Sequence, residues 1–276
     1  MCIVDHDDVR IRQWFNERKR IIQRISDGFK LRLVCIYSNL YDFYDYPYRD
    51  FSFYFACTYG SCALALQNLI KIYYQSSGVM LEDFNICSNH DAAYFDLFNL
   101  KELSTEQLTF YSTGIEVSRL EKIKYISKNT IVAQNLSVCS EEVSGTGHIR
   151  QGKINCGRCA KCLRTISELY VVDNLEAFDN VFELKEFKTH TQKELARMYC
   201  LNGKSFTNEI IYYLKKQNKI NMMFYFWLGV YIPIWKIKDV MRNYRVIRKI
   251  FYKFNIDIKL NGYRHKGEFE YFKNSL

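Results

Sequence analysis

The sequence has very little proline and no low-complexity segment. Only two prolines, Pro47 and Pro233, occur in 276 residues, and there is neither a Ser-, Gly- or Pro-rich run nor an internal repeat. These absences exclude an obvious disordered linker and a repeat architecture. A chain of this length can bury a full core, so we expect one domain of about 150–200 residues with an appendage.

A long apolar stretch is missing as well. The apolar run at residues 222–235 has fourteen residues, and Gly229 and Pro233 interrupt it. A bilayer-spanning helix needs about 20 apolar residues, and proline disturbs a helix interior. We therefore expect no transmembrane span and interpret this run as a buried core helix.

The N-terminus lacks the features of a secretory signal. No basic segment followed by an apolar stretch and a cleavage site occurs there. Six of the ten cysteines are scattered singly along the chain: Cys2, Cys35, Cys57, Cys62, Cys87 and Cys200. This distribution does not suit a disulfide framework, so the sequence favours a cytoplasmic, reducing environment.

The other four cysteines have the spacing of a metal site. They form the pattern C-x16-C-x2-C-x2-C and are Cys139, Cys156, Cys159 and Cys162. Each C-x-x-C turn lets two thiolates reach one ion, and the fourth ligand arrives from across a loop. Gly157 suits the tight bend between the first two sulfurs, while Arg158, Lys161 and Arg164 favour the thiolate form. We predict a structural zinc ion; an iron–sulfur cluster and a set of buried free thiols are the alternatives.

The positive charge is concentrated near the C-terminus. The formal net charge is +9, and residues 236–276 contain eleven Lys or Arg and four Asp or Glu, a net charge of +7. Basic and aromatic residues alternate at helical spacing just after residue 235. Such a helix either packs its apolar face on the domain or contacts anionic lipid or nucleic acid.

Short apolar runs alternate with helical patterns in the first half of the chain. The pattern predicts strands at residues 2–4, 31–37, 72–75 and 107–111, and helices at 9–26, 59–71 and 118–126. The run at 31–37 is nearly continuous, as in a strand buried on both faces. This order predicts an α/β fold with a parallel sheet, whose ligands bind at the carboxyl ends of the strands.

Several segments carry a resemblance to a known family. They are NCGRCAKCLRT at residues 155–165, STGIEVSRLEKI at 112–123, residues 87–108, and YGSCALAL at 59–66. Together they make residues 5–169 resemble the 7-cyano-7-deazaguanine synthase-like branch of the PP-loop ATP pyrophosphatases (adenine nucleotide alpha hydrolases). The resemblance implies a Rossmann-like sheet, a zinc knuckle, and ATP- and Mg²⁺-dependent adenylation of a carbonyl or carboxylate oxygen. The implied organisation is a PP-loop ATPase-like domain at 1–185, with the knuckle at 139–162, and a helical basic and aromatic region at 186–276.

One part of the family pattern is absent from these residues. Members begin with a strand and an S-G-G-x-D-S loop that binds the ATP phosphates, whereas this chain begins with CIVDHDDV, which resembles the second strand, with Asp8 at the acidic position. The missing first strand belongs in the middle of the sheet. We therefore expect strands 2–4 and 31–37 to be parallel and adjacent, strand 72–75 to lie in the same sheet, and an edge to stay unpaired. A longer protein, a separate upstream chain and a degenerate remnant all explain this start.

The resemblance also indicates a nucleotide or substrate site. Ser76 and Ser77 end a predicted strand, although an ordinary turn explains them equally well. His90 lies in a loop similar to the family's G-S-H-P stretch, and a surface role is the alternative. Arg119 and Lys122 share a helix face that can direct two positive charges at a phosphate or carboxylate. The alternative is a solvated face on which they pair with Glu116 and Glu121.

Three functions stay open at this point. The first is an ATP-dependent ligase or amidotransferase-like enzyme, acting on a small carboxylate or carbonyl substrate, whose phosphate loop another segment or chain supplies. The second is a non-catalytic scaffold stabilised by zinc. The third is a nucleic-acid-binding module that uses the knuckle and the basic tail. Assembly of several copies is compatible with each.

Overall fold

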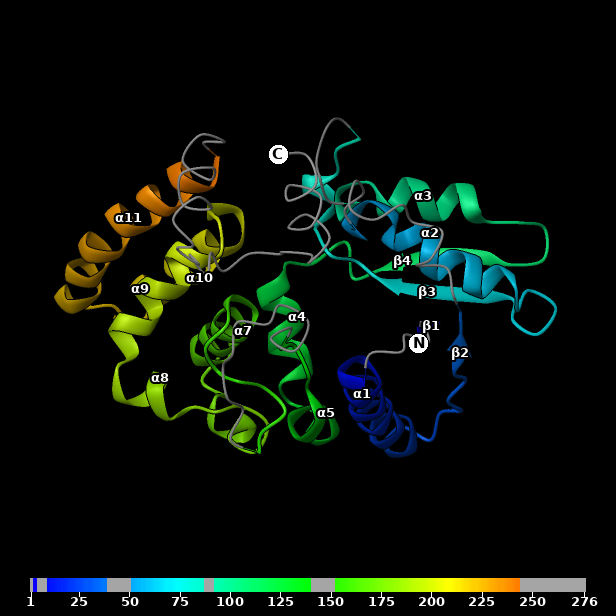
Figure 1. Cartoon of the computed structure of the whole chain (residues 1–276), viewed down its shortest axis with the longest axis horizontal. Coiled ribbons are helices and arrows are strands. Elements are labelled where there is room, and N and C mark those ends of the chain that lie inside the picture. Colours follow the sequence, from blue (N-terminus) through cyan, green and yellow to red (C-terminus); the bar gives the residue numbers. More distant parts are fainter. Residues whose placement is uncertain (1, 4–8, 39–50, 87–91, 140–151, 244–276) are drawn as a thin grey trace. The chain divides into compact units, whose positions relative to one another are not determined.

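A computed structural model describes residues 2–3, 9–38, 51–86, 92–139 and 152–243 (Figure 1). Three features predicted from the sequence lie outside these ranges: Asp8, His90 and the basic segment after residue 243. The chain divides into two compact units, residues 1–122 with 264–276 and residues 123–263, called here the N-terminal and C-terminal units. Compactness alone does not show which segments fold independently, so the domain boundary near residue 185 stays a prediction.

The N-terminal unit contains a first pair of parallel strands. Strand β1 (Cys2–Ile3) pairs with β2 (Ile36–Tyr37), with Cys2 opposite Ile36, which confirms the predicted adjacency and direction. The expected long strand at 31–37 is wrong, because only its last two residues pair. Leu31 and Val34 are 65% and 52% exposed, so this stretch is not buried on both faces. Within the described part of the chain, the apolar residues at 31–35 belong to no strand.

A second parallel pair lies further along the chain. Strand β3 (Ile72–Ser76) pairs with β4 (Thr109–Thr113) over five positions, from Ile72 opposite Thr109 to Ser76 opposite Thr113. The prediction that residues 72–75 join the first sheet is therefore wrong: the described residues form two separate two-stranded sheets. Within the described residues β3 and β4 pair only with each other, so each is an edge strand.

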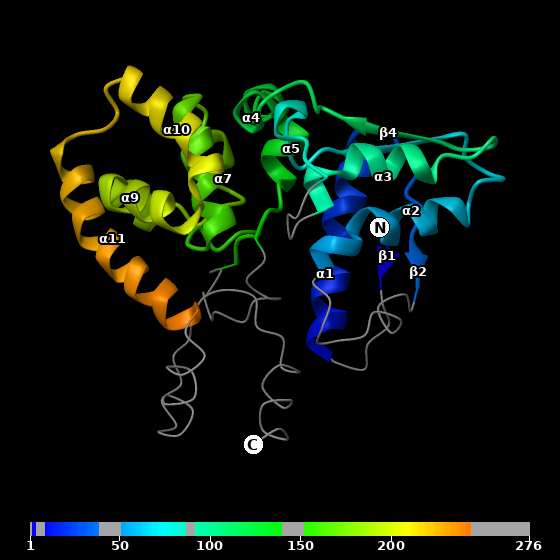
Figure 2. The ribbon, with the colours of Figure 1, turned by 90° about the horizontal axis from the view of Figure 1, so that it is seen from above.

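Helices α2 (Phe51–Leu64) and α3 (Asp96–Leu103) lie beside the second pair of strands (Figure 2). A hydrophobic core cluster of this unit lies between these elements. Ala63, Leu100, Leu108 and Phe110 are buried together, and the Tyr73 and Phe110 rings are 5.2 Å apart. Helix α2 begins and ends earlier than the predicted 59–71, because the aromatic residues before Tyr59 belong to the helix and residues 65–69 form turns. Helix α1 (Val9–Gly28) has the predicted position.

Beyond residue 122 the described chain is helical. Its elements are the end of α4 (Arg119–Ile126), α5 (Thr130–Asn135), α7 (Ala160–Val171), α8 (Lys185–Thr189), α9 (Thr191–Leu201), α10 (Lys204–Lys216) and α11 (Met222–Asn243). The core of this unit includes large side chains that are almost completely buried: Leu163, Ile166, Leu169, Phe178, Phe182, Phe187, Leu195 and Met198. The protein is thus mostly helical, with small parallel sheets.

Helix α11 is not the buried core helix expected from its apolar run. Helix α11 packs along α9 (Figure 2). Phe224 is buried, and Trp227, which stacks on Tyr231 at 6.0 Å, lies 5.6 Å from the Lys193 ammonium of α9. Met222 and Phe226, however, are 87% and 58% exposed. An apolar run shows that a helix can be covered, but not on how many sides it is covered. Within the described residues, no helix combines the length and the apolar character required to cross a bilayer.

Candidate metal centre

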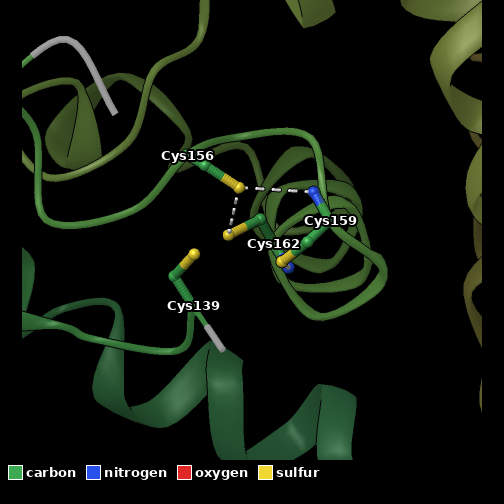
Figure 3. A group of neighbouring side chains, drawn as sticks. All are labelled: Cys139, Cys156, Cys159 and Cys162. Atoms are coloured by element: carbon green, nitrogen blue, oxygen red, sulfur yellow. Dashed lines mark hydrogen bonds between the residues drawn. The ribbon is translucent and has the colours of Figure 1, made fainter. Parts of the chain in front are cut away.

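The four spaced cysteines meet in the C-terminal unit (Figure 3). Cys139 follows α5, Cys156 lies in the loop before α7, Cys159 is the N-cap residue of α7, and Cys162 lies in its first turn. Their Sγ atoms all lie within 4.8 Å of one another. The Sγ atoms of Cys156 and Cys162 are 3.8 Å apart. The sequence prediction that these four side chains converge is confirmed.

Backbone amides also point at the sulfurs. The Arg158 and Cys159 amides donate to Cys156 Sγ at 3.5 and 3.4 Å, and the Cys162 amide donates to Cys159 Sγ at 3.4 Å. The last of these bonds caps helix α7, whose N-terminus favours negative charge. These donors therefore stabilise sulfur in its thiolate form.

Burial differs among the four cysteines. Cys139, Cys156 and Cys162 are buried, while Cys159 keeps partial contact with solvent. Hydrogen bonds from Cys156, Cys159 and Cys162 lower the pKa of the Cys139 thiol. Hydrogen bonding to Cys139 and the other two sulfurs, together with burial, raises the pKa of Cys162. Four crowded sulfurs cannot all ionise beside one another unless a cation compensates their charge, and a divalent metal ion does so.

Gly157 allows the loop between Cys156 and Cys159 to close. Its φ angle is +70°, and a Cβ atom at this position would lie 1.9 Å from the carbonyl oxygen of Glu183. No side chain fits at that distance, and the left-handed conformation favours glycine independently. The predicted role of Gly157 in the bend is consistent with both observations.

Asn155 holds the two cysteine-bearing segments together. Its side-chain Oδ1 accepts from the amides of Val138 and Cys139 at 2.8 and 3.0 Å. Its Nδ2 donates to the carbonyl oxygens of Leu136 and Val181 at 2.8 and 3.0 Å. Asn155 is fully buried, so all four bonds are shielded from water. The amide thereby fixes the backbone of Cys139 next to the loop that carries Cys156.

The cysteine spacing gave no indication of this asparagine. Asn155 stands directly before a ligand cysteine, but asparagine in a loop commonly makes only local turn bonds. Its partners at residues 136–139 are brought to it by the fold. A buried polar side chain beside a metal-binding residue is the kind of signal that only coordinates provide.

One basic residue near the knuckle, Arg164, makes a contact with an aromatic ring. The Arg164 guanidinium lies over the Phe206 ring at 4.6 Å, in a cation–π contact between α7 and α10. Lys161 is exposed. Their influence on the thiolates stays a prediction.

A second polar group lies at the carboxyl ends of β3 and β4, in the N-terminal unit. Lys122 Nζ donates to Ser77 Oγ at 2.7 Å and to the Ser77 carbonyl oxygen at 3.2 Å. Burial lowers the pKa of Lys122, and the positive charge of Arg119 lowers it further. Arg119, Lys122 and Ser77 therefore come together, whereas Ser76 is exposed at the strand end. This is the end of a parallel pair at which ligands generally bind.

The alternative prediction for α4 is that Arg119 and Lys122 pair with Glu116 and Glu121. The contacts of the two glutamates agree with it only in part. The Glu121 carboxylate accepts from the Ser118 amide at 2.9 Å, and the Ser118 hydroxyl accepts from the Glu121 amide at 3.1 Å. This reciprocal capping box employs Glu121 at the helix start. Glu116 does act on Lys122, because its charge raises the lysine pKa in opposition to Arg119.

A buried polar pair near this site was not foreseen. Gln75 Nε2 donates to Asp96 Oδ2 at 3.2 Å, joining the end of β3 to the start of α3. Both side chains are buried. Asp96 lies in the 87–108 segment, but no pattern there connects it with Gln75, 21 residues earlier.

Comparisons of this chain with protein families, with curated proteins and with solved structures give no match.

Proposed function

We propose that the protein binds one structural zinc ion through Cys139, Cys156, Cys159 and Cys162. The observation that carries the proposal is the convergence of all four Sγ atoms within 4.8 Å. Ligands on a tetrahedral zinc ion at Zn–S distances of about 2.3 Å lie about 3.8 Å apart. The 3.8 Å separation of the Cys156 and Cys162 sulfurs agrees with that value.

The same distances support a single ion over an iron–sulfur cluster. In a cluster the cysteines bind different iron atoms, so their sulfurs lie further apart than ligands that share one ion. Four thiolate ligands also fill the tetrahedral shell of zinc and leave no position for a substrate or water. We therefore assign the ion a structural role: it links the Cys139 segment to the start of α7.

Elemental analysis of the purified protein tests this proposal. We expect one zinc per chain, retained during dialysis against a weak chelator and lost from Cys159→Ser. Cys200→Ser is the matched control, because Cys200 is a partly buried cysteine of α9 outside the cluster. Protein without zinc, or equal retention in Cys159→Ser and the control, would contradict the site. A cluster would instead give iron and sulfide.

A second candidate function rests on the polar group at the ends of β3 and β4. We propose that Ser77, Arg119 and Lys122 bind the phosphate or carboxylate of a substrate in ATP-dependent chemistry of the PP-loop pyrophosphatase type. Support comes from the resemblance in sequence and from the contact between Lys122 and Ser77. In such an enzyme these side chains would orient an anionic group, while ATP would transfer its adenylyl group to the carbonyl or carboxylate oxygen of the substrate and release pyrophosphate.

The same hypothesis limits what this chain can do by itself. The 276 residues contain no S-G-G-x-D-S loop, whose backbone amides would surround the triphosphate. We expect calorimetry to find weak ATP binding by the chain alone and no release of pyrophosphate. An added segment or partner chain that carries the loop should restore both, and Arg119→Ala should abolish them again. Lys124→Ala is the control, since Lys124 is exposed on the same helix.

Other outcomes separate the remaining hypotheses. Strong turnover by the 276-residue chain would show that the nucleotide site lies elsewhere. Failure of every extended form to bind ATP would favour the zinc-stabilised scaffold. Binding of nucleic acid that disappears on removal of the metal would favour the nucleic-acid-binding module.

A further inference from the structure

The solvent side of helix α11 is apolar along almost four turns. Its exposed residues on this side, called here the α11 face, are Met222, Met223, Phe226, Gly229, Val230, Pro233 and Ile234. They recur at helical spacing opposite Phe224 and Tyr231, which lie on the side packed along α9. No charged residue interrupts α11 before Lys236. An apolar surface of this extent is uncommon on a soluble monomer and marks an interaction site.

Positive charge borders the α11 face at both ends. Lys215 and Lys216 are exposed at the end of α10, and the Lys215 ammonium lies 5.8 Å from the centre of the Tyr225 ring. Lys236 is exposed at the other end of the face. Residues 210–238 contain five lysines and neither Asp nor Glu. One of the five, Lys219, is already paired with Asp173 at 2.5 Å.

We propose that the α11 face binds the surface of an anionic lipid bilayer, with the helix axis in the plane of the membrane. Its apolar side chains would enter the boundary between headgroups and acyl chains, and the lysines at both ends would contact the headgroups. Tyr225 is a residue of the kind that is enriched at this interface, and Phe226 is typical of the apolar side of helices that lie there. The sequence that follows the face is also positively charged, because seven of the eight charged residues at 236–253 are basic.

The charge pattern disfavours a second copy as the occupant. In a symmetric dimer the same patch forms both sides of the contact. Lysines of one copy would then face lysines of the other, and the α11 face offers no acidic residue to compensate them.

Nucleic acid is disfavoured for a different reason. Phosphate binding requires basic or hydrogen-bonding groups along the contact, but the middle of the α11 face consists of Phe226, Gly229, Val230 and Pro233. An anionic bilayer provides both an apolar region and negative charge, so it matches the middle and the ends of the face together.

Flotation of the full-length protein with vesicles tests the proposal. We expect the protein to float with vesicles of phosphatidylcholine and phosphatidylserine at low salt, and to float much less with phosphatidylcholine alone or at high salt. Gly229→Asp places a negative charge in the middle of the face, where a new Cβ meets nothing within 4 Å. This variant should lower the partition coefficient by more than about fivefold, because one charge near an anionic surface changes it by about that factor.

Matched variants separate charge from fold. Gly229→Ala fills the same open position without charge, and Asn208→Asp adds one negative charge at an exposed position of α10 outside the face. Both should float like the wild type, and Lys215→Ala with Lys216→Ala should weaken binding by about fivefold for each lysine. The proposal is wrong if the wild type does not float or if Gly229→Asp floats as well as Gly229→Ala. Dimerisation or nucleic-acid binding that Gly229→Asp abolishes, without flotation of the wild type, would assign the face to those partners instead.

Discussion

Replacing Asn155 with alanine should lower both the free energy of unfolding of the C-terminal unit and its affinity for zinc. The side chain makes four buried hydrogen bonds, two accepted and two donated. Each contributes about 1 kcal/mol net. The Val181 carbonyl also accepts from the Asn155 backbone amide at 2.8 Å, so it keeps one partner in the variant. We therefore expect a loss of about 3–4 kcal/mol in the free energy of unfolding, a large share of the 5–15 kcal/mol typical of a domain.

The effect on the metal follows from the position of the bonds. Two of the freed groups are the amides of Val138 and Cys139. Without them the Cys139 segment loses its attachment to the loop before α7, although all four cysteines remain. Residues that orient metal ligands commonly change affinity by about 10- to 100-fold when they are replaced. Competition with a chromophoric chelator should show such a decrease for Asn155→Ala.

Asn174→Ala provides the comparison for this experiment. Asn174 is another partly buried asparagine of the C-terminal unit, and its Nδ2 donates to the Ser127 carbonyl oxygen at 2.6 Å. Its loss should lower the free energy of unfolding by about 1 kcal/mol and leave the zinc affinity unchanged. Denaturant titrations of zinc-loaded and zinc-free protein would measure both variants. If Asn155→Ala behaved like Asn174→Ala in both measurements, the role assigned to Asn155 would be refuted.

Three further outcomes are expected. Gly157→Ala should destabilise the protein far more than Gly152→Ala in denaturant titrations. Both glycines have a positive φ, but only at Gly157 would the new Cβ meet a backbone oxygen. Equal losses of stability in the two variants would contradict this steric argument. A strong chelator should lower the melting temperature of the wild type but not that of Cys159→Ser, because only the former has zinc to lose; an unchanged wild-type melting curve would contradict a structural metal. Burial lowers the pKa of Lys122 below its ordinary value of 10.5, so the protonated side chain is less favourable in the folded protein than in the unfolded chain. The free energy of unfolding of the wild type relative to Lys122→Met should therefore rise as the pH approaches 10.5. If this relative free energy fell with pH, the folded protein would stabilise the ammonium instead.

The sequence predicted the local parts of this structure better than the long-range ones. Cysteine spacing predicted the knuckle because ligands two residues apart can reach one ion from a single bend, whatever the rest of the fold does. The parallel direction of β1 and β2 followed in the same way from a strand, helix and strand in succession. The bonds of Asn155 depend on which segments come together in space, and no spacing encodes them.

The errors share a physical origin. Hydrophobicity at residues 31–37 and 222–235 shows that burial would be favourable, but coverage depends on neighbours that the segment does not specify. Residues 31–35 lie outside the ladder, and helix α11 packs along α9 while Met222 and Phe226 stay exposed. The separation into two strand pairs was missed for the same reason, because β3 carries the pattern of a sheet strand irrespective of its partner.

The Cys159 sulfur belongs both to the four-cysteine cluster and to the N-terminal cap of α7, so the first turn of α7 depends on the chemical state of this cysteine. The same sulfur that belongs to the four-cysteine cluster accepts a hydrogen bond from the Cys162 amide, and Cys159 is the N-cap residue of the helix. It is also the cysteine with the most solvent contact of the four. Oxidation or alkylation of this sulfur would remove a ligand and a helix cap in one step. Modification of Cys159 and unwinding of the first turn of α7, a largely buried helix, should therefore occur together.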